Sequence, residues 1–134
     1  GMGFAHVLLC IKDARRNTMH GKVGFGDDVQ ALVRHFDFSL SAPPDVFLVA
    51  LQNNADILIS DIDDAKIAAR IPAWYRRHVA AGCFVLFPLV VKGKPVGLIY
   101  ADSPRAGDIT ISEKELSLLK SLRNQAVLAI RQSA

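Results

Sequence analysis

The sequence predicts one α+β domain, in which a central antiparallel sheet of about five to six strands carries the C-terminal helix on one face and short helices and loops on the other. Two hydrophobic runs, 83–91 and 94–102, flank a Lys-Gly-Lys turn, and so tight a connection requires antiparallel pairing. A long helical pattern follows over 112–132, and short strand-like and helix-like segments alternate before residue 83. We expect a single domain over 1–134, because this length suits one core.

The composition is that of a folded protein. Of 134 residues, 51% are hydrophobic and 22% are charged, which supplies a core and excludes general disorder. No apolar run reaches the roughly 18 residues of a membrane-spanning helix, and the N-terminus lacks the features of a signal peptide. Gly1 before Met2 resembles the remnant of a removed tag. We expect a cytoplasmic protein in which Cys10 and Cys83 are reduced thiols, while a disulfide between them stays open as an alternative.

Short elements are predicted before the hairpin. Residues 36–40 alternate between apolar and polar side chains, as a strand does, and 27–36 repeats apolar side chains at helical spacing. The segment 61–82 is predicted to be helix and loop, with Pro72 at a helix start and Gly82 past its end. The predicted strands are 6–12, 19–25, 36–40 and 57–60, and the other predicted helices are 27–36 and 45–53.

The hairpin is predicted to lie at the centre of the sheet. Both of its strands are apolar on both faces, which is typical of strands that are covered on each side. Glycine in its turn is suited to a positive φ. Pro88 does not fit a central strand, because proline has no N–H to donate, and it predicts a bulge or a local edge at that point.

The C-terminal helix has the clearest signal. Ser112 and Glu115 form a capping box at its start. The apolar stripe that we expect to face the sheet consists of Leu116, Leu119, Leu122, Ala126 and Ile130. Further apolar residues make this face wider than one sheet contact needs, so we expect the helix to pair with its copy in a homodimer. The predicted dimer interface consists of Leu118, Leu122, Val127 and Ala129.

The sequence contains no arrangement that predicts catalysis. Its four histidines lack zinc-binding spacing, so we expect no metal and no cofactor. Asp61, Asp63 and Asp64 resemble half of a calcium loop, but helix capping explains them more simply. No serine lies in a nucleophile elbow, and no glycine-rich stretch matches a nucleotide-binding loop. Nothing near Cys83 in the sequence would activate its thiol.

The charge pattern indicates solubility. The net charge is +3, and the positive residues are spread along the chain rather than clustered. We therefore expect neither nucleic acid nor a membrane as a partner.

The segment 73–79, AWYRRHV, is the best candidate for ligand contact. It sets Trp74 and Tyr75 beside cationic residues such as Arg76. Aromatic rings stack on flat ligands, and guanidinium groups pair with carboxylate or phosphate, so the segment can line a pocket for an anionic or aromatic ligand. The alternative places Trp74 in the core and the arginines in water.

The hairpin and the terminal helix together resemble the C-terminal half of a GAF domain. That family has a proline-containing strand, a short turn around glycine, a strand of the pattern G-[VL]-[IL], and a helix of the pattern fs..e..ll..la.qaa.ai. These features fall on Pro88, Gly93, Gly97, Leu98, Ile99, Glu115, Leu118, Leu119, Gln125, Ala126 and Ile130. The segment ILISD also sits where GAF domains carry a short strand that ends in Asp, here Asp61. The resemblance covers about residues 4–132 and is strongest over 84–130.

The resemblance implies a GAF/PAS-like sandwich that senses a small molecule, dimerises and controls an output domain of a longer chain. Its ligand pocket would lie under the middle segment, on the face opposite the terminal helix. More narrowly, the tail resembles the GAF-like region of bacterial HDOD signalling proteins. The candidate ligand-binding residues are Phe47, Asp61, Trp74, Tyr75, Arg76, Phe87 and Tyr100.

The chain also departs from the family. The usual N-terminal GAF helix is missing from residues 1–134, which indicates a fragment or a shortened variant. The sequence lacks the NKFDE-type pattern of cyclic-nucleotide-binding members and the Cys-His attachment of bilin-binding members. Members that reduce free methionine sulfoxide use clustered cysteines, whereas here two cysteines lie far apart in the sequence.

Three hypotheses follow. The leading one is a non-enzymatic sensory or regulatory module in bacterial signal transduction, which binds a small ligand, dimerises, or does both. The second is an interaction scaffold whose pocket is filled by its own bulky side chains. The third is a GAF-type thiol reductase that uses Cys83.

Overall fold

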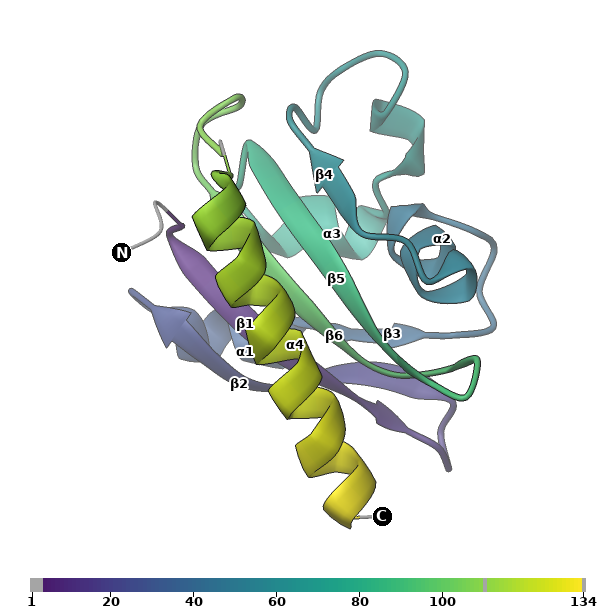
Figure 1. Ribbon diagram of the computed structural model, residues 1–134. Coiled ribbons are helices and arrows are strands. Elements are labelled where there is room, and N and C mark those ends of the chain that lie inside the picture. Colours follow the sequence, from purple (N-terminus) through teal and green to yellow (C-terminus); the bar gives the residue numbers. More distant parts are fainter. Residues whose placement is uncertain (1–3, 110, 134) are drawn as a thin grey trace.

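The computed structural model describes residues 4–109 and 111–133 of the chain and confirms the α+β class. A six-stranded antiparallel sheet has the order β3-β2-β1-β6-β5-β4 (Figure 1). The strands are β1 His6–Asp13, β2 Thr18–Gly26, β3 Asp37–Ser39, β4 Ile57–Ile59, β5 Cys83–Val91 and β6 Lys94–Ser103. The helices are α1 Val29–His35, α2 Val46–Asn53, α3 Ala73–His78 and α4 Glu113–Ser133, with a 3₁₀ turn, η1, at Ala68–Arg70.

Helices cover the two faces of the sheet unequally. The long helix α4 crosses one face over β5 and β6, while α1, α2 and α3 lie behind the sheet on the other face (Figure 1). Each layer encloses its own hydrophobic core, and Cys10 and Cys83 belong to different cores. Both cysteines are free thiols. Among the described residues, no helix is both long enough and apolar enough to cross a membrane.

The central hairpin is confirmed. β5 pairs with β6 from Cys83 opposite Ser103 to Val91 opposite Lys94, and β6 pairs in turn with β1. Most residues of the two strands are buried, because both faces of the hairpin are covered. Lys92 and Gly93 of the turn both have positive φ, 51° and 77°, as a tight two-residue hairpin turn of this twist requires.

Pro88 lies at a local edge of the sheet, which is one of the two predicted alternatives. β4 pairs only with residues 84–86. The register between β5 and β6 shifts after Leu89, but the extra residue there is Val96 of β6. The carbonyl of Ser103 accepts a hydrogen bond from Gly82 N on the β5 side. Ser103 is paired with Cys83, and backbone N–H and C=O groups of successive residues point to opposite edges of a strand. The backbone groups of the odd-numbered residues of β5, as far as Leu89, therefore point toward β6. The backbone of Pro88 points to the open edge beyond β4. Its missing N–H therefore removes no bond from the central ladder.

The terminal helix begins as predicted. Glu115 N donates to Ser112 Oγ at 3.1 Å, and Ser112 N donates to Glu115 Oε1 at 3.4 Å. Leu119 is buried, and the half-buried residues of the sheet-facing stripe are Leu116, Arg123, Ala126, Val127 and Ile130. Leu122, predicted in this stripe, is instead 45% exposed. The reason is the helical period, which carries the contact line from Leu119 to Arg123 and leaves Leu122 to one side.

The segment between β4 and β5 is mostly loop. Pro72 caps α3 as predicted, but the helix ends at His78, four residues before Gly82. Gly82 has another role: a Cβ placed on it would lie 2.4 Å from the backbone nitrogen of Ala106. Glycine at this position therefore allows the loop before β5 to lie against the loop that follows β6.

Candidate ligand-binding site

Aromatic side chains fill the space between the sheet and the helices α2 and α3. The ring centroids of Phe47 and Phe84 are 5.5 Å apart in a stacked arrangement, and those of Phe36 and Tyr100 are 4.6 Å apart. Trp74 stacks on Phe38 with a centroid distance of 5.3 Å. Such edge and stacked contacts are the preferred geometries of aromatic pairs. The aromatic cluster consists of Phe36, Phe38, Phe47, Trp74, Tyr75, Phe84 and Tyr100.

The structure thus brings together four of the predicted ligand-binding residues, Phe47, Trp74, Tyr75 and Tyr100. Three of them, Phe47, Tyr75 and Tyr100, have no exposed surface, and Trp74 is half-buried against the same core. They contact one another, so the volume that the sequence assigns to a ligand is occupied by side chains.

Asp61 and Arg76 lie at the surface beside the cluster. Arg76 donates to the carbonyl of Ile62 at 2.7 Å and to Asp63 Oδ1 at 3.1 Å, while Asp61 Oδ1 accepts from Asp63 N at 2.9 Å. These bonds close the turn after β4 and tie it to α3. Among the described residues, no group of three or more His, Cys, Asp or Glu side chains could hold a metal ion.

Phe87 lies away from the other candidates. Along β5, Phe84 and Leu86 face α2 and α3, whereas Val85 and Phe87 belong to the core under α4. The guanidinium of Arg123 lies 5.9 Å from the Phe87 ring centroid. Phe87 therefore lies on the face covered by α4, opposite the face on which the pocket was predicted, because successive residues of a strand point to opposite faces.

A chain of hydrogen bonds leads from the buried aromatic cluster to the surface. The hydroxyl oxygens of Tyr75 and Tyr100 are 2.8 Å apart, and the Tyr100 hydroxyl donates to Asp102 Oδ2 at 2.6 Å. The other oxygen of Asp102 lies 2.9 Å from Nδ1 of His6. Nε2 of His6 lies 2.8 Å from the carbonyl oxygen of Asp27. The chain connects α3 with β6, β1 and the loop before α1.

The partners fix where the protons lie. Tyr100 gives its single proton to Asp102, so the bond between the tyrosines is donated by Tyr75. A carbonyl oxygen and a carboxylate both accept, so each ring nitrogen of His6 donates and the ring is an imidazolium paired with the Asp102 carboxylate. Burial lowers the pKa of His6, but its hydrogen bond and attraction to Asp102 and Asp27 outweigh burial and raise the pKa above 6.5.

The two tyrosines stay protonated at every physiological pH. Burial raises the pKa of Tyr75 and of Tyr100 well above the usual value of 10. The negative charge of Asp102 raises both further, because a second anion beside it is unfavourable. The chain is consequently a fixed set of donors that end on one buried carboxylate.

A cavity of about 310 Å³ opens where this chain reaches the surface, between α1 and α3. His6 and Asp102 form part of its wall, and the rings of His35 and His78 stack beside it with centroids 3.9 Å apart. Desolvation, His35 and Arg77 lower the pKa of His78, which favours the neutral form of its ring. The cavity is lined by Ala5, His6, Asp27, Asp28, Ala31, Leu32, His35, His78, Val79, Ala80, Ala81, Asp102 and Pro104.

This cavity between α1 and α3 is the site that sequence reasoning missed. Its lining comes from β1, the loop before α1, α1 itself, α3 and the end of β6. His6 and Asp102 are 96 positions apart, and only the pairing of β1 with β6 sets them opposite each other. The one available signal was a charged residue, Asp102, at the end of an otherwise apolar strand.

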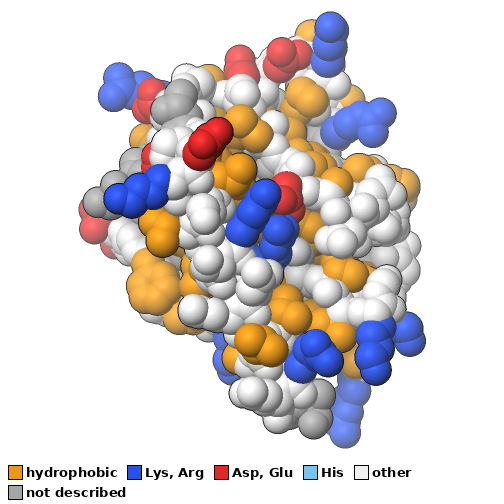
Figure 2. All heavy atoms as spheres, in the orientation of Figure 1, with side chains coloured by type: hydrophobic (Ala, Val, Ile, Leu, Met, Phe, Trp, Pro, Cys, Tyr) orange, Lys and Arg blue, Asp and Glu red, His pale blue; other side chains and the backbone are white. Residues whose placement is uncertain are grey.

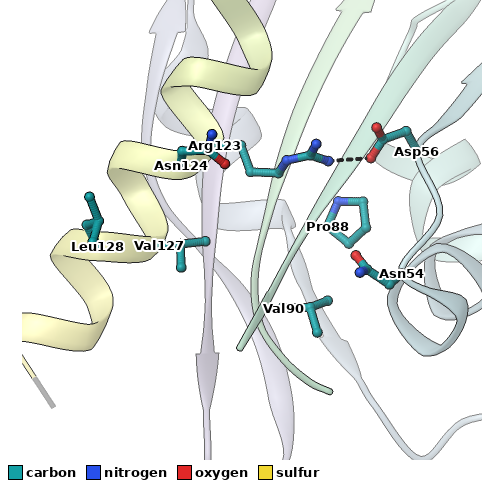
Figure 3. A pocket seen from close by; sticks show the side chains of 8 residues that line it. All are labelled: Asn54, Asp56, Pro88, Val90, Arg123, Asn124, Val127 and Leu128. Atoms are coloured by element: carbon teal, nitrogen blue, oxygen red, sulfur yellow. Dashed lines mark hydrogen bonds and ion pairs between the residues drawn. The ribbon is translucent and has the colours of Figure 1, made fainter. Parts of the chain in front are cut away.

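A second hollow of about 410 Å³ lies on the other side of the sheet (Figure 3). Arg123 reaches from α4 across β5, and its guanidinium donates to Asp56 Oδ1 at 2.6 Å. Asn54, which follows α2, and Pro88 lie beside this ion pair. Because Arg123 and Asp56 satisfy each other, the hollow presents a neutral polar surface rather than a free charge.

Neither cysteine is placed for chemistry with a substrate. Cys83 has no exposed surface, and its thiol donates to the carbonyl of Arg105 at 3.1 Å. Cys10 is equally buried, and burial raises the pKa of its thiol to about 12. A thiol attacks as the thiolate, which the raised pKa of Cys10 disfavours. Both cysteines pack as small side chains in the two cores.

Comparisons with known proteins agree with this architecture. The sequence profile of the GAF domain family matches residues 2–130. The chain is similar to the GAF domain of an Acinetobacter phosphoenolpyruvate-protein phosphotransferase, with 17% identity and a TM-score of 0.77 over 98% of this chain and 74% of that one. A search of curated protein sequences finds no match.

Two further structures show that this fold occurs in proteins of different kinds. The GAF domain of a two-component sensor histidine kinase from Bacillus halodurans is 14% identical, with a TM-score of 0.72 over 97% of this chain and 83% of that one. The type II free methionine-R-sulfoxide reductase from Thermoplasma acidophilum is 15% identical, with a TM-score of 0.67 over 97% and 80%. With its profile match over nearly the whole length and this sheet topology, the chain belongs to the GAF domain family of sensory and regulatory modules found in signalling proteins.

Proposed function

We propose that this GAF domain is a non-enzymatic sensor of the bacterial cytoplasm that binds a small ligand in the cavity between α1 and α3. It would control an output domain of a longer chain, for which the sequence resemblance favours the HDOD class. The observation that carries the proposal is the cavity itself, whose wall includes the buried His6–Asp102 pair. Apolar lining with a few fixed polar groups is the usual make-up of a small-molecule site.

The hydrogen-bonded chain supplies a route from this cavity to the rest of the domain. A ligand that bonds to His6 or Asp102 would change the hydrogen bonds that these two residues make. The same chain of hydrogen bonds ends on Tyr75 of α3. β6, which carries Asp102, packs on its other face against α4. A ligand that favours one position of α1 and α3 would therefore bias the sheet and, through it, α4.

A ligand screen with a blocked cavity tests the site. Thermal unfolding is measured with nucleotides, amino acids and aromatic acids, and hits are confirmed by calorimetry. Ala31→Phe fills the cavity from an exposed position on α1, and Gln30→Phe adds the same bulk to the neighbouring exposed position outside the lining. We expect Ala31→Phe to abolish binding and Gln30→Phe to keep it. Binding that survives Ala31→Phe would place the ligand elsewhere.

The aromatic cluster favours a second candidate function, an interaction scaffold without a ligand. Its rings already occupy the region that the sequence assigns to a pocket. If no compound shifts the unfolding temperature of the wild-type protein, the scaffold becomes the better account. Trp74→Ala separates the two regions, since a ligand of the α1–α3 cavity keeps its affinity in this variant, whereas a ligand held among the rings loses it.

Dimerisation through α4 is part of the proposal. Leu118 and Leu122 are 53% and 45% exposed, Ala129 is exposed, and Val127 is half-buried. The exposed apolar surface continues onto β2, where Phe25 is 70% exposed. Soluble monomers rarely present large contiguous apolar patches, so this surface supports an interface.

Sedimentation at micromolar concentration tests the dimer. We expect the double variant Leu118→Glu with Leu122→Glu to be monomeric. Leu58→Glu on β4 is the matched control, because Leu58 is 48% exposed but lies on the other edge of the sheet. A monomeric wild-type protein would contradict this part of the proposal alone.

A reductase assay tests the absence of catalysis. Free methionine sulfoxide is offered with a thioredoxin system, and we expect no turnover because the Cys83 thiol is enclosed. Turnover that disappears in Cys83→Ser would overturn the non-enzymatic assignment.

A further inference from the structure

Basic residues that are distant in the sequence gather at one end of the molecule. The turn between β1 and β2, the turn between β5 and β6, and the C-terminal end of α4 all lie at the same end of the sheet (Figure 1). Figure 2 shows blue side chains without red ones at the lower end of this face. We call this region the basic end; it consists of Lys12, Arg15, Arg16, Lys92, Lys94 and Arg131.

The antiparallel topology produces this gathering. Ile11 pairs with Gly97, which sets the end of β1 beside the start of β6. The Cδ1 atom of Ile130 lies 3.6 Å from the position of a Cβ on Gly97, which brings the last turns of α4 to the same place. The sequence expectation of dispersed charge and no membrane partner rested on linear spacing, which says nothing about this convergence.

Little negative charge opposes the basic end. Asp37 pairs with Arg16 at 3.3 Å, and Asp13 Oδ1 accepts from the backbone N–H groups of Arg15 and Arg16. Within the described residues, no ion pair engages Lys12, Lys92 or Lys94. Lys92, Lys94, Arg15 and Arg131 are exposed to solvent. The ends of these side chains are therefore available to an anionic partner.

We propose that the basic end docks the domain on a bilayer surface rich in anionic lipid headgroups. The two turns project from the end of the sheet (Figure 1), so a flat anionic surface can approach both of them together. The segments 12–17, 91–96 and 128–132 contain no aromatic residue. Single-stranded nucleic acid is held largely by base stacking on aromatic rings, and nothing of that kind is present in these segments.

The expected interaction is electrostatic and shallow. No large apolar side chain stands in either turn to enter the hydrocarbon layer. Each basic residue near an anionic surface strengthens the attraction, so removing one weakens partition onto vesicles by roughly fivefold. Salt screens charges that are separated by more than about 10 Å at 0.1 M ionic strength, so binding falls as salt rises.

Co-sedimentation with vesicles tests the docking. The wild-type domain is mixed at low salt with vesicles of phosphatidylcholine alone, or of phosphatidylcholine with phosphatidylglycerol. The test variant is Lys92→Gln with Lys94→Gln. The control variant is Lys66→Gln with Lys114→Gln, which removes the same charge from exposed positions outside the basic end. Single-stranded DNA is offered in a parallel binding assay.

We expect the wild-type protein to sediment only with the anionic vesicles and to dissociate when salt is added. The test variant should lose roughly 25-fold in partition and the control variant less than about twofold, if each turn lysine contributes its own share. Equal losses in both variants would show that net charge alone acts and would overturn the proposal. Binding to DNA without binding to vesicles, or no binding to either, would overturn it as well.

Discussion

The two faces of the sheet are closed in different ways. Three short helices and an aromatic cluster close the face of α1, α2 and α3, and a chain of four polar side chains runs through that layer. The opposite face is closed by one helix, α4, together with the segment before it, over a mainly aliphatic core. Among the described residues, Phe87 is the one buried aromatic side chain of that core. One layer is specified by a chain of hydrogen bonds as well as by shape. The other is specified mainly by shape, and the ion pair of Arg123 with Asp56 is its polar contact between α4 and the segment before β4.

This difference indicates which layer has more freedom to move. Hydrogen bonds between buried groups fix one arrangement, because any shift leaves a polar atom unpaired. Apolar contacts between a helix and a sheet tolerate small displacements at lower cost. Under the proposed function, the α1–α3 layer reads the chemical signal and α4 passes a displacement on.

Core truncation should give the largest effects and rank the two layers. We expect Phe47→Ala to lower the free energy of unfolding by about 4 kcal/mol and Leu119→Ala by about 3 kcal/mol, because both side chains are fully buried and leave cavities. Urea denaturation measures both. A smaller loss for Phe47→Ala than for Leu119→Ala would mean that the aromatic layer is less tightly packed than described.

Removal of the buried carboxylate comes next. Asp102→Leu leaves the His6 imidazolium and the Tyr100 hydroxyl without their acceptor, and we expect a loss of about 3 kcal/mol. The control is Asp108→Leu, since Asp108 is an exposed partner of Arg105 and should cost below about 1 kcal/mol. An Asp102→Leu protein as stable as the wild type would show that the polar chain does not specify its layer.

Substitution of the two tyrosines tests which hydroxyl donates each hydrogen bond of the chain. Tyr100→Phe removes the donor to Asp102 and the acceptor of Tyr75, so we expect a loss of about 2 kcal/mol. Tyr75→Phe removes only the terminal donor and should cost about 1 kcal/mol. Denaturation of the single and double variants measures the coupling. Equal costs for the two substitutions would contradict the assigned proton positions.

The pH dependence of His6 should be the smallest effect. Its pKa is raised in the folded state, so its stabilising contribution is complete below the unfolded value of about 6.5 and is lost as pH rises through the folded pKa. The side chain is 26% exposed, so we expect a contribution below about 1 kcal/mol. Unfolding profiles of the wild type and of His6→Gln should converge above the folded pKa. Parallel profiles would argue against an imidazolium.

Much of the fold could be predicted from local pattern. The hairpin was predictable from its apolar arms and turn, and the start of α4 from Ser112 and Glu115, because these signals act over a few residues. Pro88 was recognised as an irregularity for the same reason. Its position at an open edge depends on the length of β4, which the sequence predicted as 57–60 and the structure shows as Ile57–Ile59.

The candidate site was less accessible to prediction. The aromatic residues of α2 and α3 were found, but nothing local shows that Phe36 and Phe38 complete the cluster. The alternation of side chains along β5 could have placed Phe87 on the face covered by α4. Because every residue of this strand is apolar, its sequence does not show which side chains point to which face. The pairing of His6 with Asp102 and the basic end depend on strand order, a long-range property without a local signature.

The proline at the open edge of β5 also bears on self-association. Beyond β4, a neighbouring chain could extend the sheet only by exchanging backbone hydrogen bonds with residues 87–91, and Pro88 offers no N–H there. The most hydrophobic strand of the domain is thereby kept from seeding the intermolecular strand stacking that leads to fibrils.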